Sequence, residues 1–419
     1  MQKKLIALAI AGLSGAAFAQ SNVTVYGAAD ASLDFIRVSG GSPSDDTPNY
    51  NRVSSNGSHI GFKGMESLGN GMVAVFQYET AVNLDGGGAT SALLGFSRDS
   101  YVGLAGGFGT VIMGSASGPT RNLANAMDVN TNHDGITSNR AILGKLGGAW
   151  AGLNLNTSAD LLTTGSSTLG AVAVSGQQRS GNGASIFDQY LPNVIAYVSP
   201  NFSGFQATIG YVANENKSDL AATKVNTSAV DLGLTYSNGP IWVGLTHGDI
   251  QVRNQDSGAA GTLASTLGGV LGNDIRTKET RLGGKYDFGN ATVRLLWSQN
   301  KSDASLGDIG KQTTWGIGGT FNVTANGKIT GQYYRANDIK DGALAGSETG
   351  AKFYTLGYEH SLSKRTSLNA AYAYLKNDAN TDSLGGLPIG GYDFGNNSTG
   401  LAAGGVKLSG LQFGLRHSF

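Results

Sequence analysis

The chain has 419 residues, of which 29 are basic and 29 are acidic, so its formal net charge is zero. This balance excludes a bulk electrostatic case for binding nucleic acid, which depends on a clear excess of basic residues. Cysteine is absent, which excludes a disulfide framework, a thiolate metal site and a cysteine nucleophile. Glycine is frequent, with 65 residues, but it follows no Gly-X-Y repeat of the collagen kind.

Residues 1–19 have the layout of a secretory signal peptide. Lys3 and Lys4 precede an apolar run from Leu5 to Leu13, and small residues lead on to Ala19. The run is about half of the ~20 apolar residues that a membrane-spanning helix needs. We predict that residues 1–19 are removed on export and that residues 20–419 form one domain. That domain has 27 basic and 29 acidic residues and a formal charge of −2.

After residue 19, apolar residues recur at every second position in segments of about ten residues, a period typical of β-strands. In the first segment Val23 and Leu33 fall on one face, whereas Asp30 and Asp34 fall on the other. We predict sixteen strands, at residues 23–37, 58–66, 72–84, 97–105, 109–115, 190–199, 204–213, 227–237, 241–252, 277–288, 291–301, 312–323, 328–338, 351–362, 366–377 and 405–419.

The connections between these segments alternate in length. Residues 68–71 and 237–240 are short turns, whereas residues 252–276 and 378–404 are long and polar. Outer-membrane barrels have short periplasmic turns and longer extracellular loops, and a soluble β-sandwich has no reason for this alternation. A barrel of about sixteen strands is wide enough to leave an aqueous channel. The sequence therefore predicts an all-β fold, a 16-stranded antiparallel transmembrane β-barrel around a water-filled pore.

Short motifs recur in a fixed order along the chain. They are Val-Thr-Val-Tyr-Gly at 23–27, Ile-Gly-Phe-Lys-Gly at 60–64, Tyr-Val-Gly-Leu at 101–104, Ser-Pro-Asn-Phe-Ser-Gly-Phe at 199–205 and Gly-Leu-Arg-His-Ser-Phe at 414–419. Together they resemble the general porins of Gram-negative bacteria, most closely the β-proteobacterial branch. The resemblance implies a homotrimer in the cell outer membrane that gives small hydrophilic solutes and ions a path for passive diffusion. It also implies a third extracellular loop folded inward as a constriction, for which the candidate is residues 116–189.

The resemblance implies further partners. Phe419 would be the signal that the barrel-assembly machinery recognises, although a lipid-facing last strand would also account for a terminal phenylalanine. Outer-membrane lipid and lipopolysaccharide would surround the barrel. No cofactor, metal site or nucleic-acid partner is expected.

Charged residues on the polar faces of the strands and on the long loop are the candidates for lining the pore, because rings of charged side chains set channel selectivity. The strand candidates are Asp30, Asp34, His59, Lys63, Glu79, Asp231, Arg281, Lys285 and Arg294. The loop candidates are Arg121, Asp128, Asp134, Arg140, Lys145, Arg179 and Asp188. Either parity fits the strand from Arg98 to Leu104, so the facing of Arg98 stays open.

This chain departs from the family where related sequences tend to carry arginine. The residues at these positions are His59, Ser115, Tyr190 and Ala196. The resemblance alone therefore does not imply strong anion selectivity. His59 is either a pH-sensitive wall charge, since the ordinary pKa of histidine is about 6.5, or a neutral polar residue of the lumen.

Two other functions fit the same barrel: a substrate-selective channel with a solute site on the long loop, and a structural or adhesive surface protein. An outer-membrane hydrolase is not supported. Gly-x-Ser-x-Gly is not found in a strand-turn-helix setting and His-Glu-x-x-His is missing, so no catalytic residues are predicted.

Overall fold

The computed structural model describes residues 22–40, 47–85, 98–131, 133–144, 185–214, 225–254, 274–380, 383–384, 387–388, 391–394 and 404–419. The predicted signal peptide lies outside these residues, and so do Lys145 and Arg179 of the predicted constriction loop.

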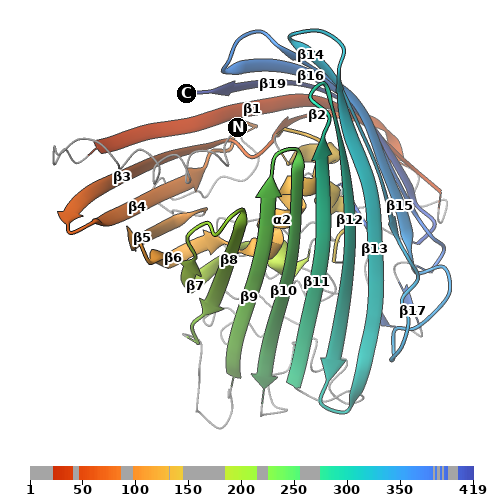
Figure 1. The fold of residues 1–419 in the computed structure, drawn as a ribbon. Helices are drawn as coiled ribbons and strands as arrows, with labels where there is room; N and C mark the ends of the chain where they lie inside the picture. Colours follow the sequence, from red (N-terminus) through yellow and green to blue (C-terminus); the bar gives the residue numbers. More distant parts are fainter. Residues whose placement is uncertain are drawn as a thin grey trace.

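A single antiparallel sheet of seventeen strands forms the wall of the molecule (Figure 1). Its strands are β1 (Asn22–Ser39), β2 (Thr47–Ser55), β3 (His59–Gly69), β4 (Met72–Ala81), β5 (Ser100–Gly106), β6 (Gly109–Ser117), β7 (Tyr190–Val198), β8 (Phe205–Val212), β9 (Val225–Asn238), β10 (Ile241–Asn254), β11 (Asp274–Asp287), β12 (Ala291–Ala304), β13 (Gly307–Asn322), β14 (Gly327–Ala336), β15 (Ala351–Ser361), β16 (Thr366–Asn377) and β19 (Lys407–Ser418). Since β2 and β3 pair in succession with β1, sixteen strands span the wall, as predicted.

The sheet closes on itself. β1 pairs with β19 from Ala28↔Ser418 to Ser39↔Lys407, and its other edge pairs with β2 and β3. The described strands therefore form a closed ring. Strand pairing satisfies the backbone polar groups of a membrane-spanning sheet, for which lipid offers no partners.

Side chains alternate between the two faces of the wall, which confirms the predicted pattern. On β15 the outward Leu356 is 61% exposed, whereas the inward Phe353 is fully buried. On β1 the outward Phe35 is 43% exposed, whereas the inward Asp34 is fully buried. A wall with this alternation presents apolar residues to lipid and most of its polar residues to the interior.

One strand was not predicted. β2 occupies residues that the sequence analysis left in a loop, because Thr47–Ser55 is largely polar and shows no clear apolar alternation. β2 and β3 are separated by a break at Asn56-Gly57-Ser58, where Gly57 has a φ of +71° and the Asn56 N–H donates to the Asp30 carbonyl at 2.9 Å. A glycine adopts this left-handed conformation with little strain.

Helical turns occur in the loop between β6 and β7, the third of the long connections. They are α2 (Pro119–Met127) and the 3₁₀ turns η3 (Gly135–Thr137), η4 (Asn139–Ala141) and η5 (Ile186–Asp188). Figure 1 shows α2 inside the curve of the strands. A small hairpin of β17 (Ser383–Leu384) and β18 (Leu387–Pro388) occurs in the last connection. Within the described ranges, the helices are all too short or too polar to cross a membrane.

Candidate functional site in the pore

The third loop begins with α2, whose first turn is held by a carboxylate on the wall. Asp231 on β9 accepts hydrogen bonds from the Thr120 N–H at 3.1 Å and from the Thr120 hydroxyl at 2.5 Å. The N-cap residue, Gly118, supplies no side-chain cap of its own. A carboxylate satisfies free N–H groups at a helix N-terminus and interacts favourably with the helix dipole. Asp231 therefore fixes the point at which the loop enters the barrel.

The inner wall under α2 is built from glycines. A Cβ on Gly233 of β9 would lie 2.5 Å from the Pro119 Cβ, and one on Gly283 of β11 would lie 2.9 Å from the Met127 side chain. A real Cβ essentially never approaches another atom this closely. The wall therefore has no side chains at these positions, and the apolar face of α2 packs directly against the backbone of the strands.

A buried ion cluster ties the end of the loop to β11. Arg281 donates to both carboxylate oxygens of Asp188 at 2.6 and 2.8 Å and to Glu279 at 2.7 Å. All three side chains are fully or almost fully buried. Glu279 also accepts from Ser298 at 2.9 Å and from the Ser185 hydroxyl of the loop. We call Asp188, Arg281 and Glu279 the loop latch.

A second set of contacts holds the middle of the loop against β12 and β14. Arg294 donates to the Asp128 carbonyl, and Gln332 donates to the Thr137 carbonyl at 2.8 Å. The Asp128 carboxylate is buried within the loop, where it accepts from the Asn139 N–H at 3.0 Å. Burial raises the pKa of Asp128, because water is the better solvent for its charge.

Arg98 points into the barrel, which settles its facing. Its guanidinium contacts the buried Glu79 carboxylate, which also accepts from the Tyr26 hydroxyl at 2.9 Å. Arg98 and Arg121 lie 5.3 and 4.3 Å from the centre of the Tyr190 ring. These distances are typical of cation–π contacts.

His59 lies at the edge of this cluster. Its Nδ1 is 2.8 Å from the Gly57 carbonyl oxygen, and its ring centre is 6.3 Å from that of Tyr26. Lys63, further along β3, places its ammonium 4.8 Å from the centre of the Tyr26 ring. Both face the interior, as predicted from parity, and their roles in conduction stay predictions.

The remaining predicted residues are also engaged with neighbours. Asp30 and Asp34 are fully buried on the inner face of β1 and contact Arg416 at 3.0 Å and Arg52 at 3.4 Å. Arg140 donates to the His133 carbonyl and lies 4.0 Å from Asp134. Burial, reinforced by the charge of Arg121, lowers the pKa of Arg140. Lys285 faces Arg294 across the pair of β11 and β12.

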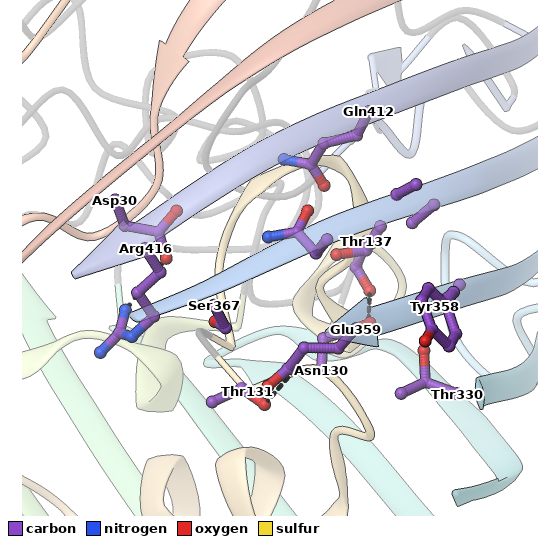
Figure 2. Close-up of a pocket in the computed structure, with 14 residues that line it drawn as sticks. Asp30, Asn130, Thr131, Thr137, Thr330, Tyr358, Glu359, Ser367, Gln412 and Arg416 are labelled. Atoms are coloured by element: carbon purple, nitrogen blue, oxygen red, sulfur yellow. Dashed lines mark hydrogen bonds and ion pairs between the residues drawn. The ribbon is translucent and has the colours of Figure 1, made fainter. Parts of the chain in front are cut away.

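A small polar pocket lies between the third loop and the wall (Figure 2). Asn130, Thr131 and Thr137 line it from the loop, and Glu359, Gln412 and Arg416 line it from the strands. Thr131 donates to Glu359 at 2.6 Å across its edge. Its volume of about 30 Å³ suits about two water molecules. The described residues contain no group of three metal-binding side chains.

The inner face is apolar near the loop end of β15, β16 and β19, contrary to the expectation of a polar interior. Phe353, Leu375 and Leu408 point inward and are fully buried. Tyr392 and Phe394 of the last loop are buried in the same cluster, and Tyr392 is held by hydrogen bonds with Asn377 on both its N–H and its carbonyl. The last loop therefore also packs inside the barrel.

Some of these residues were not predicted. Glu279 and Arg416 lie on the polar faces of predicted strands, so parity could have identified them. Tyr334, whose hydroxyl accepts from Asn139 at 3.2 Å, and Tyr392 carry no sequence signal, because their partners come from distant segments.

Comparison with known proteins supports the interpretation of the barrel as a channel. The chain matches the Gram-negative porin family over residues 5–380. It is 30% identical to outer membrane porin protein 32 of Delftia acidovorans, with all of both chains covered. It is 27% identical to an outer membrane porin protein of Bordetella pertussis, covering 90% of this chain and 95% of that one. The structure of the anion-selective porin from Comamonas acidovorans superposes with a TM-score of 0.67 at 25% identity, covering 96% of this chain and 100% of that one.

The closed wall of sixteen antiparallel strands, its apolar outer face and the family match lead to one conclusion. The chain belongs to the Gram-negative porin family and is an outer-membrane β-barrel that forms a channel for solutes.

Proposed function

We propose that this porin is a general diffusion channel with weak charge selectivity, narrowed by the third loop at residues 116–189. The observation that carries the proposal is the pairing of opposite charges on the inner side of the wall. Asp188 and Glu279 share Arg281, and Glu79 is matched by Arg98. Charges that neutralise one another at close range leave a weak net field in the channel.

The anion-selective relative raises the opposite possibility. In this chain His59, Ser115 and Tyr190 stand where the family resemblance implied wall arginines. Arg121 and Arg140 come instead from the loop, and both are almost fully buried. These two arginines support a slight preference for anions rather than a strong one.

Reversal potential in a planar bilayer tests the proposal. With a tenfold gradient of potassium chloride across the bilayer, we expect less than half of the ideal value of about 59 mV. Arg121→Gln should move the potential toward cations, and Lys364→Gln, in an exposed turn, should not. A wild-type potential near the ideal anion value would contradict weak selectivity, and an absence of conductance would favour a structural or adhesive role.

A substrate-selective channel is the second candidate, and the length of the third loop, residues 116–189, is the feature that favours it. The described part of this loop lines one polar pocket. The pocket's volume of about 30 Å³ suits water better than a sugar or an amino acid. Saturable block of the current by one class of solute would support this candidate, and equal passage of neutral solutes of one size would oppose it.

The proposal includes partners and processing. The family resemblance supports a homotrimer, recognition of Phe419 by the barrel-assembly machinery and contact with lipopolysaccharide. It also supports removal of residues 1–19 on export. No catalytic role is assigned, because the relatives described above are all named as porins.

A further inference from the structure

The outward face of the barrel carries a row of basic residues at the loop end of β14, β15, β16 and β19. The strand register places Arg335 opposite Lys352, Lys352 opposite Lys376, and Lys376 opposite Lys407. On the next strand, Arg37 lies two residues before Ser39, the partner of Lys407. We call Lys352, Lys376 and Lys407 the lysine row.

The lysine row points toward the membrane side of the wall. Each lysine is next in sequence to a fully buried inward residue, namely Phe353, Leu375 or Leu408. Along the same outward face of β15, Tyr354 and Leu356 are 39% and 61% exposed. The parity of the strands therefore directs the three ammonium groups outward.

The charges of the lysine row have no counter-ion in the described part of the protein. Arg335 has an aspartate, Asp378, at 2.7 Å, but Lys352, Lys376 and Lys407 form no ion pair with any described residue. A similar row on β12 and β13 differs, since Lys301 contacts Asp303 at 2.8 Å and Lys311 contacts Asp341 at 2.6 Å. Like charges directly opposite one another destabilise a sheet. An anion from outside the protein would offset the repulsion among the three lysines.

A row of tyrosines lies directly beneath the lysines. Tyr333, Tyr354 and Tyr374 are opposite one another in register, and the rings of Tyr354 and Tyr374 stack at 5.0 Å. Aromatic girdles mark the level at which the apolar membrane core meets the headgroups. Two residues along a strand rise about 7 Å, which places the lysine row at headgroup depth.

The leaflet follows from the topology. Phe419 and the first residues of β1 lie at the end of the barrel that carries the short turns, and the lysine row lies at the end with the long loops. Long loops are extracellular in outer-membrane barrels, so the row faces the outer leaflet. The abundant anionic groups of that leaflet are the phosphates of lipid A.

We propose that Lys352, Lys376 and Lys407 bind the phosphate groups of lipid A in the outer leaflet. The inference rests on the proposed contact with lipopolysaccharide and gives it a position. Lysine suits this task because its apolar stem lies along the membrane surface while its ammonium reaches the headgroups. Arg37 extends the same positive surface onto β1.

Binding of bisphosphorylated lipid A to the purified full-length barrel in detergent tests the inference. The variant Lys352→Gln/Lys376→Gln should bind lipid A roughly 30-fold more weakly than wild type does. This factor corresponds to the loss of ~1 kcal/mol for each of two basic residues beside an anionic lipid surface. Lys364→Gln/Arg365→Gln removes two exposed charges at the turn end and should bind like wild type. Lipid A without phosphates should bind weakly to every variant, and inorganic phosphate should not displace the intact lipid.

Unchanged binding of Lys352→Gln/Lys376→Gln, equal loss in both double variants, or tight binding of phosphate-free lipid A would each overturn the inference. Displacement by inorganic phosphate would show a free-anion site instead and would also overturn it. Heat-modifiable gel mobility checks that each variant is folded. Conductance measured on the same samples tests the proposed channel function independently. If lipid binding fails while the porin conducts normally, only the lipid inference is overturned.

Discussion

Arg281 illustrates how a buried charge holds a loop in a barrel. Its guanidinium has carboxylates on two sides, one from the loop and one from its own strand, and a third contact to the Thr120 carbonyl at 3.2 Å. Removal of one member of such a buried network leaves the others without compensation, which costs more than the network itself contributes. The loop latch is therefore a strong contribution to keeping the end of the third loop docked against β11.

We expect Arg281→Gln to destabilise the docked state by about 3–5 kcal/mol, because Asp188 and Glu279 would remain buried without their partner. The protein should melt at a lower temperature in detergent, and its single-channel current should become noisier. Arg276→Gln is the matched control on the same strand, since the Arg276 side chain is 47% exposed in its ion pair with Asp249. Equal losses in the two variants would contradict the role of the latch.

We expect Asp128 to make docking of the third loop depend on pH. Its pKa is raised above 3.8 in the docked loop by burial and returns toward 3.8 when the loop opens to water. The docked state thus binds the proton more tightly, so docking strengthens as pH falls through the interval between the raised pKa and 3.8 and weakens as pH rises through it.

Acidification from neutral pH should therefore reduce current noise in the wild-type channel. Asp128→Asn should flatten this dependence, whereas Asp341→Asn, in an exposed loop outside the pore, should keep it. Noise that grows on acidification, or that falls equally in Asp128→Asn, would show that another group controls docking.

At the scale of elements, α2 can lie close to the wall because the wall residues beneath it are glycines, which have no side chains. The helix packs against β9 and β11 at glycines, and an added side chain at Gly283 would enter the space of Met127 and Leu123, 2.9 and 3.1 Å away. Gly284, one residue further along β11, has nothing within 4 Å of its Cβ position. The two neighbouring glycines therefore form a matched pair, since Gly283 faces α2 and Gly284 faces away from it.

We expect Gly283→Leu to push α2 toward the middle of the pore and to lower the single-channel conductance, with an overpacking cost of about 1–3 kcal/mol. Gly284→Leu adds the same side chain to the opposite face and should leave conductance unchanged. Equal conductance in both variants would show that α2 does not narrow the channel.

At the scale of the whole molecule, barrel closure brings the two ends of the described chain together. The Phe419 N–H donates to the Gly27 carbonyl at 3.1 Å, and the Gly27 N–H donates to the Phe419 carbonyl at 3.3 Å. The Phe419 side chain remains 46% exposed. An exposed ring at the closing strand fits both readings of this residue, an assembly signal and an ordinary contact with lipid.

The variant Phe419→Ser separates these readings. If Phe419 is the assembly signal, this variant should reach the outer membrane in several-fold lower amounts, with normal conductance once inserted. Phe413→Ser is the control, because Phe413 is 51% exposed on the outward face of the same strand. Equal losses would favour the simple lipid contact.

The sequence alone determined the barrel, because the facing of most strand residues follows from their parity. Parity placed Asp30, Glu79, Arg281 and Arg294 on the inner face, and the structure agrees. It also limited the candidates for the pore, although it could not say which charges remain free to act on solutes.

Only the tertiary structure decided how those charges are used. Asp188 and Arg281 are 93 residues apart, and Thr120 and Asp231 are 111 apart, so no local pattern connects them. The facing of Arg98, the apolar contact of Tyr392 with the inner wall and the uncompensated lysine row likewise depend on which segments closure of the barrel brings together. The alternation of side chains along a strand fixes which residues share a face. The partner of a charged residue, in contrast, comes from a distant segment that only the closed sheet brings next to it.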